Sequence, residues 1–267
     1  TIRVGSGGVM LPHYSAYKVA EYFRLLEALH PGRIDLGLGR ALGGRPLSTR
    51  ALHEGRTYHY DQYPQQVLDL IDYFQETTDE HRFPGLLASP SVDTHPEIWL
   101  LGSSDESARI AAQLGTSYGF AQFFGTPGGP EAIRWYKEHF RPGRLGDKPR
   151  ALAAVLAICA ETEEEANELA LSTDLYFLGI ERGFELPHLP SVETARNWPY
   201  TEFDLELIRR ARSRRIVGTP SRVREGLERL AEEYAADELL IVGPIHDFGK
   251  RLASFRLIAE AFGLEKS

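Results

Sequence analysis

The chain has 267 residues, of which 42% are hydrophobic, 10% aromatic and 25% charged. This composition is that of an ordinary globular protein and excludes a disordered, collagen-like or disulfide-scaffold chain. The formal charge of −8 gives no general attraction to nucleic acid or to an anionic membrane, and no apolar run approaches the roughly 20 residues of a membrane span. The single cysteine, Cys159, excludes an intrachain disulfide and a cysteine-based zinc site. We therefore expect a cytoplasmic protein with no nucleic-acid, membrane or metal partner.

Apolar runs of strand length alternate with segments of helical periodicity along the chain. The predicted strands are Ile2–Leu11, Ile34–Leu38, Ile98–Leu101, Tyr118–Phe123, Ala151–Cys159 and Glu238–Val242. Helices are predicted over Ser15–Leu29 and Pro64–Glu76, with others beginning near Ser103, Pro130, Thr162, Phe203, Thr219 and Phe248. Because such alternation is typical of a parallel sheet buried on both faces, the pattern predicts an α/β fold, either a barrel or a doubly wound sheet.

Two long connections interrupt this alternation, Arg40–Tyr63 and Gly179–Tyr200. Connections of this length in a compact domain are usually functional or mobile. We predict one domain over residues 1–267, with residues 179–200 as a mobile loop.

A serine-rich segment follows one of the predicted strands directly. The strand ends at Gly102, and a helix with Ser103, Ser104 and Ser107 in its first turn begins at once. The free N–H groups and the positive dipole end of such a turn, together with hydroxyls and a glycine that allows close approach, favour a phosphate. The alternative is a capping arrangement in which Ser103 or Ser104 acts with Glu106.

Two further segments place unusual residues at predicted strand ends. Arg40 follows the strand Ile34–Leu38, where ligands bind in parallel α/β folds, and it could grip a phosphate or simply pair with a surface carboxylate. The first strand contains the run Gly5-Ser6-Gly7-Gly8, which weakens a buried strand unless a bulge, a cis peptide or a closely approaching flat ligand requires it.

The histidines give weaker signals. His13 and His246 both follow predicted strands, where a site would lie, and they are the only catalytic candidates. His30 is interpreted as a structural residue at a helix end. The others are expected to be exposed in loops or at helix ends, namely His53, His59, His81, His95, His139 and His188.

These segments together resemble the bacterial luciferase-like flavin monooxygenases. The matching stretches are Arg3–Pro12, Leu29–Arg40, Gly102–Gly115 and Ile216–Pro220, in the same order and spacing along the whole chain. The resemblance implies a (β/α)8 TIM barrel that binds reduced FMN at the carboxyl ends of its strands, with O₂, a small organic substrate and a separate flavin reductase as partners. It also implies a homodimer.

The resemblance assigns roles to particular residues. Arg40 falls on the phosphate-binding arginine, Ser104 and Ser107 on further phosphate ligands, and Ser103 on an acidic residue beside them. Gly102 lies at the same cradle. Gly7 and Gly8 fall on a pair that forms a non-prolyl cis peptide under the flavin ring, and Val9 and Met10 continue this strand end. The reactive cysteine of luciferase corresponds to Gly39, so that feature is absent.

The resemblance also implies a shortened N-terminus. Only the last six βα units of the barrel are evident, and the segment with the family's paired histidines has no match in this chain. Two alternatives to an FMN monooxygenase stay open: hydride transfer with the deazaflavin coenzyme F420, and a non-catalytic flavin-binding member of the family.

Overall fold

The computed structural model describes residues 2–44, 46–55, 60–76, 81–184 and 186–264. The chain divides into two compact units, the first being Thr1–Phe120 with Gly128–Ala151 and the second Ala121–Pro127 with Leu152–Ser267. The expectation of a single domain over 1–267 stays a prediction. No helix in the described ranges is long and apolar enough to cross a bilayer.

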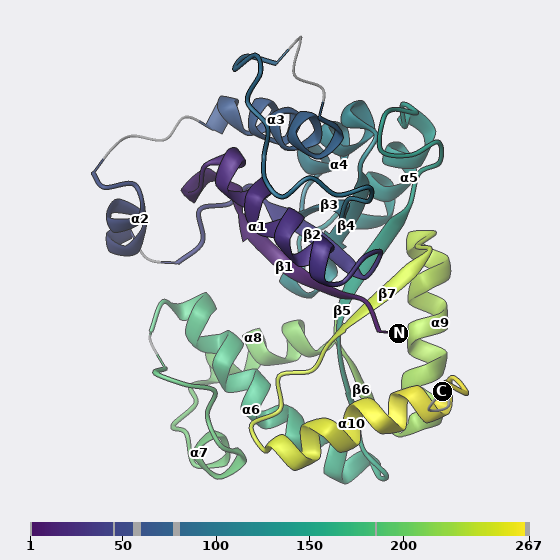
Figure 1. Ribbon diagram of the computed structural model, residues 1–267. Coiled ribbons are helices and arrows are strands. Elements are labelled where there is room, and N and C mark those ends of the chain that lie inside the picture. The colour runs from purple at the N-terminus through teal and green to yellow at the C-terminus, as the bar shows by residue number, and fades with distance from the viewer. Residues whose placement is uncertain (1, 45, 56–59, 77–80, 185, 265–267) are drawn as a thin grey trace. The chain divides into compact units, whose positions relative to one another are not determined.

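The first unit is built on parallel strands that follow one another in chain order (Figure 1). These strands are β1 (Val4–Met10), β2 (Ile34–Gly39), β3 (Glu97–Gly102) and β4 (Ser117–Ala121). The helices are α1 (Ala16–Leu29), α2 (Pro46–Leu52), α3 (Tyr63–Gln75), α4 (Asp105–Leu114) and α5 (Gly129–His139), with 3₁₀ turns at Leu11–His13 and Tyr60–Gln62. Helix α1 packs against α3, and α4 packs against α5.

The central strands of this unit are apolar because both of their faces are covered. Leu36 and Leu38 of β2 are fully buried, and Ile98 and Leu100 of β3 are nearly so. A strand buried on both faces needs apolar residues at successive positions instead of in alternation, which explains the continuous runs in the sequence. The predicted parallel α/β architecture is therefore confirmed.

Strand β1 carries an irregularity at its glycines. Ser6 pairs with Leu36 but Val9 pairs with Leu38, so the register shifts between them. The peptide bond between Gly7 and Gly8 is cis, as the family resemblance implies. The Ser6 hydroxyl spans the irregularity, accepting a hydrogen bond from the Gly37 amide and lying 3.0 Å from the Gly37 carbonyl oxygen.

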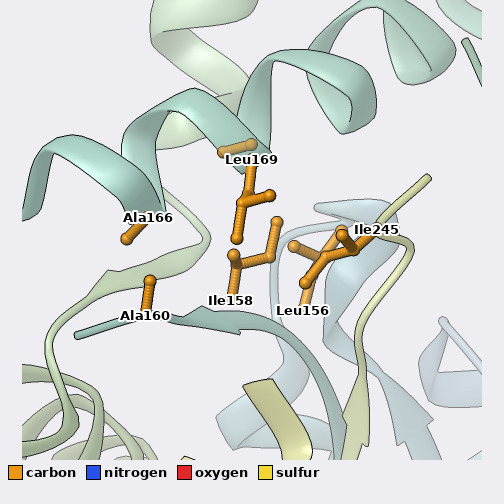
Figure 2. Close-up of a cluster of buried hydrophobic side chains, with 7 residues drawn as sticks. Leu156, Ile158, Ala160, Ala166, Leu169 and Ile245 are labelled. Carbon is orange, nitrogen blue, oxygen red and sulfur yellow. The ribbon is translucent and has the colours of Figure 1, made fainter. Parts of the chain in front are cut away.

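The second unit contains β5 (Ala151–Cys159), which pairs in parallel with both β6 (Ile216–Gly218) and β7 (Glu238–Val242). Its helices are α6 (Glu163–Arg182), α7 (Val192–Arg196), α8 (Glu202–Arg212), α9 (Pro220–Tyr234) and α10 (Phe248–Ala261), and a 3₁₀ turn covers Gln122–Phe124. Figure 2 shows a buried cluster in which Leu156 and Ile158 of β5 pack against Leu169 of α6 and against Ile245. This cluster fixes α6 against the strand.

The two long connections contain more regular structure than the sequence indicates. Helix α2 lies within Arg40–Tyr63, and α7 lies within Gly179–Tyr200. Helix α6 runs on to Arg182, so the second connection begins later than expected. The stacked rings of Phe184 and Trp198, 5.4 Å apart, hold this segment together. Its mobility stays a prediction.

The thiol of Cys159 lies at the end of β5 and is 1% exposed. Burial raises its pKa to about 11, whereas an unfolded cysteine titrates near about 8.5. We expect iodoacetamide to label native protein very slowly at pH 7 and at pH 9, and urea-unfolded protein rapidly at pH 9. Because the folded state holds this proton more tightly, stability should fall as pH rises from about 8.5 towards 11. Native labelling that rises with a midpoint near pH 8.5 would contradict the prediction.

Candidate functional site

The pairing register of β1, β2 and β3 places three segments that were singled out in the sequence side by side. Met10 of β1 pairs with Gly39 of β2, which in turn pairs with Leu101 of β3. Arg40 and Gly102 therefore follow directly at neighbouring strand ends, beside Met10. This is the carboxyl edge of a parallel sheet, where ligands bind in α/β folds.

The N-terminus of α4 lies at this edge and carries no side-chain cap. Ser104 occupies the N-cap position with extended backbone (φ −144°, ψ 162°), but its hydroxyl makes no capping hydrogen bond. Ser104 is thus the N-cap residue, as the capping alternative expects, but the side-chain hydrogen bond of that alternative is absent. Within the described ranges, the hydroxyls of Ser103, Ser104 and Ser107 have no hydrogen-bond partner. The first turn of α4 thus presents free N–H groups and free hydroxyls together.

Gly102 lies directly before this turn. A Cβ atom at Gly102 would collide with the side chain of Ser107, which is itself buried. The glycine therefore allows the first turn of α4 to pack closely against the end of β3. The close approach of a phosphate expected at Gly102 stays a prediction, and the neighbour that the structure shows there is Ser107.

Arg40 lies beside the same turn. Its guanidinium forms an ion pair with the Glu106 carboxylate in the first turn of α4. Both side chains are accessible, with 26% of Arg40 and 59% of Glu106 exposed. The structure therefore contains the carboxylate partner that was the alternative for Arg40, and the same contact holds the guanidinium next to the open N-terminus.

A buried tyrosine contacts the backbone at the N-terminus of α4. Tyr118 of β4 donates a hydrogen bond from its hydroxyl to the Ser104 carbonyl oxygen at 3.1 Å. Burial raises the pKa of Tyr118, so the phenol stays protonated and keeps its role as donor. Sequence reasoning did not find this positioning residue, because only the folded sheet places β4 next to the α4 turn.

The glycines of β1 and β2 let two backbones approach closely. A Cβ atom on Gly8 would lie 2.7 Å from the Gly37 carbonyl oxygen, and one on Gly39 would lie 2.7 Å from Met10 Sδ. Gly7, by contrast, has open space where a Cβ atom would stand. The strand end from Gly7 to Met10 is therefore closely packed towards β2 and open at Gly7.

His13 and His53 form a pair that the sequence did not predict. Since a carbonyl only accepts, His13 Nε2 donates to the Leu42 carbonyl and His53 Nε2 donates to the Pro12 carbonyl at 3.0 Å. His13 Nδ1 is left as an acceptor, 3.1 Å from His53 Nε2. His53 directly follows the end of α2, as a helix-end residue would, but it is half-buried and not exposed as expected. The pair ties the connection after β2 to the turn after β1.

The other histidines differ in their surroundings. His81 is buried, not exposed as predicted, because it packs on Tyr73 and lies 3.5 Å from the Asp69 carboxylate. His246 is exposed after β7 in the second unit. His30 is the C-cap of α1, as predicted. His59 lies outside the described residues, and the described ranges contain no cluster of three or more metal-ligating side chains.

The free hydroxyl of Ser104 leads to a stability prediction. Ser104→Ala should change the free energy of unfolding by less than about 0.5 kcal/mol, because no capping bond is lost. Thr162→Ala is the matched comparison, since the Thr162 hydroxyl accepts from the Glu165 amide at 3.1 Å and caps α6. It should lower stability by about 1 kcal/mol in urea titrations. Equal losses in the two variants would show that Ser104 caps α4 in solution.

Comparison with known proteins gives the family. The model for luciferase-like monooxygenases matches residues 1–238. The chain is 50% identical over 262 residues to the uncharacterized protein YwcH of Bacillus subtilis, spanning 98% of this chain and 79% of that protein. It is 37% identical over 263 residues to the N-acetyl-S-alkylcysteine monooxygenase of Bacillus subtilis, spanning 97% and 78%.

Solved structures agree on the fold. Apo-MsnO8 superposes with a TM-score of 0.85 at 36% identity, over 100% of this chain and 79% of that one. The oxygenating constituent of 3,6-diketocamphane monooxygenase from Pseudomonas putida, solved with FMN, gives 0.64 at 18% identity over 98% and 79%. An F420-dependent secondary alcohol dehydrogenase gives 0.60 at 10% identity over 95% and 76%. The chain belongs to the luciferase-like monooxygenase family.

Proposed function

We propose that this protein is a flavin-dependent monooxygenase that uses reduced FMN and O₂ to oxidise a small organic molecule. One arrangement carries the proposal: Arg40 and the uncapped, serine-rich N-terminus of α4 meet at the carboxyl edge of the first unit's sheet. An arginine beside free backbone N–H groups and hydroxyls is suited to a phosphate monoester. Membership of a monooxygenase family supplies the class of reaction.

The residues at this edge fit the phosphate of FMN. In the proposal, Ser103, Ser104 and Ser107 donate hydrogen bonds from their hydroxyls, and Arg40 supplies the positive charge. Gly102 keeps the first turn of α4 close to β3. Within the described ranges these hydroxyls have no competing hydrogen-bond partner, and the Ser104 side chain does not cap α4. Both observations support the fit of this turn to a phosphate.

The strand end from Gly7 to Met10 is proposed to support the flavin ring. Gly7 and Gly8 present backbone without side chains, and Val9 and Met10 continue the same strand end. When bound, reduced flavin supplies the electrons that activate O₂, while the protein orients it and excludes water. A separate flavin reductase and a homodimer stay predictions from the family resemblance.

The two catalytic candidates, His13 and His246, differ in their hydrogen-bond partners. Both ring nitrogens of His13 are engaged with Leu42 and His53, which favours a role in holding the connection after β2. His246 is exposed in the second unit, and within the described ranges its imidazole has no polar partner; its role as a proton-transfer group stays a prediction. As a first substrate we propose an N-acetyl-S-alkylcysteine, the class named for a relative that is 37% identical to this chain.

Anaerobic titration tests the cofactor. We expect saturable binding of reduced FMN, followed, on admission of O₂ with a thioether substrate, by O₂ consumption and formation of an oxygenated product. Binding of the reduced deazaflavin alone, with substrate oxidised without O₂, would replace the proposal by hydride-transfer chemistry. FMN binding without turnover of any substrate would indicate a flavin-binding protein without catalysis. Failure to bind either cofactor would overturn the proposal.

A further inference from the structure

The second unit contains a hollow of about 480 Å³ that the proposed flavin site does not use. Its volume lies within the roughly 300–1,000 Å³ typical of small-molecule pockets. It opens at the carboxyl end of β7, between α6, α10 and the segment 186–189. The lining comes from Tyr176, Leu186, Pro187, His188, Leu189, Ile241, Val242, Gly243, Pro244, Arg251 and Phe255.

Hydrogen bonds hold the walls of this hollow in place. The Thr173 hydroxyl of α6 donates to the Pro244 carbonyl at 2.7 Å, which fixes the segment after β7 against α6. The buried Ser172 hydroxyl donates to the Pro190 carbonyl and so fixes the end of the segment 186–190 to the same helix. The hollow is therefore bounded by anchored segments and exists without a ligand.

The interior of the hollow is mainly apolar. Ile241 and Leu189 are half-buried there, and the Phe255 ring packs against the backbone of Gly243, where a Cβ atom would lie 3.0 Å from it. These surfaces gain free energy when an apolar group replaces water. They suit an alkyl or aryl tail.

A cation without a carboxylate partner lies at the edge of the hollow. Arg251 is in the first turn of α10, and within the described ranges its guanidinium forms no ion pair; its recorded contact is with the Phe255 ring, at 5.9 Å. The neighbouring charges are already engaged: Lys250 pairs with Glu165 at 2.5 Å, and the Asp247 carboxylate caps α10 by accepting from the Lys250 amide. The helix dipole adds further positive potential at this turn. Arg251 is thus free to bind an anion.

We propose that this hollow binds a small organic anion with an apolar tail, with a carboxylate head on the Arg251 guanidinium and the tail between Ile241, Leu189 and Phe255. The exposed His188 imidazole at the rim is placed to donate a further hydrogen bond to the head. None of the residues that line this hollow is among those proposed to hold the flavin phosphate, and the proposal does not require flavin to be bound.

Calorimetric titration of the flavin-free chain with ligands of equal tail length tests the proposal. Octanoate should bind saturably. Octanol, which has no charge, and octylammonium, which has the opposite charge, should bind at least about tenfold more weakly because neither can form the charge-assisted hydrogen bond. Acetate, which lacks the tail, should show no measurable binding. Octyl sulfate is included to separate a carboxylate-selective site from a general anion site. Binding of octanol as tight as that of octanoate would overturn the proposal, as would no binding of octanoate at millimolar concentration.

Two variants locate the ligand. Arg251→Gln should weaken octanoate binding about 10- to 100-fold, the range expected for losing a charged hydrogen bond, and should leave octanol unaffected. Arg256→Gln is the control, since Arg256 lies on the same helix, pairs with Glu260 and does not line the hollow. Equal effects of the two variants would place the ligand elsewhere. Reduced-FMN binding, measured in parallel, should be the same in both variants, so failure here is distinguishable from failure of the flavin proposal.

Discussion

Arg40→Ala should weaken FMN binding about 10- to 150-fold and leave riboflavin binding unchanged. The arginine side chain lies beside the open N-terminus of α4, and in the proposal it contacts only the phosphate of the cofactor. A hydrogen bond to a charged group contributes about 1.5–3 kcal/mol, which gives this range. Riboflavin has the same ring without the phosphate, so it reports whether the rest of the site is intact. Fluorescence titration with both ligands measures the ratio directly.

A matched control separates charge from position. Arg109 lies on α4, where it pairs with Asp105 four residues earlier and stacks on Trp135. Arg109→Ala should therefore not change FMN affinity. Glu106→Gln should act in the opposite direction to Arg40→Ala, because it removes the carboxylate that both neutralises Arg40 and repels a phosphate. An equal loss of affinity for FMN and for riboflavin in Arg40→Ala would show that Arg40 supports the fold and does not bind the phosphate.

Strands with continuous apolar runs were predictable from the sequence. The bounds expected for Ala151–Cys159 and Glu238–Val242 are those of β5 and β7. Strand β6 was missed because Ile216–Gly218 is too short to show a periodicity. Helix α2 was missed because none of its residues is buried, so the sequence carries no amphipathic pattern there. A helix or strand can be predicted from a single sequence when it is buried, because burial imposes a pattern of apolar residues.

The candidate site was predictable where its residues end a strand or begin a helix. Arg40, Gly102 and Ser104 are marked by their position along the chain, and parallel pairing brings such positions to one edge. The contact between His13 and His53 was not predictable, since the two residues are 40 positions apart and nothing in either segment marks the partner. The burial of His81 was hidden in the same way, because its partner Asp69 lies on a different segment.

The buried carboxylate of Asp174 leads to the largest expected loss of stability. Asp174 of α6 is 3% exposed and accepts hydrogen bonds from Arg212 at the end of α8 and from Arg215 just before β6. Burial raises the pKa of Asp174, while the two guanidinium groups oppose this shift. Because the Arg215 side chain is only 6% exposed, removing the carboxylate leaves a buried positive charge without its counter-charge. Asp174→Ala should lower the free energy of unfolding by about 3–5 kcal/mol.

The size of this effect follows from burial, and a matched variant on the same helix shows it. Glu168 pairs with Arg196, but both side chains are more than half exposed, so Glu168→Ala should change stability by less than about 1 kcal/mol. Urea titrations followed by circular dichroism measure both variants against the parent. Asp174→Ala combined with Arg215→Ala should lose less than the sum of the two single losses, since the second substitution removes the unpaired charge. Additive losses in that double variant, or a loss below about 1 kcal/mol in Asp174→Ala, would mean that water reaches Arg215 and that the ion pair does not hold β6 against α6.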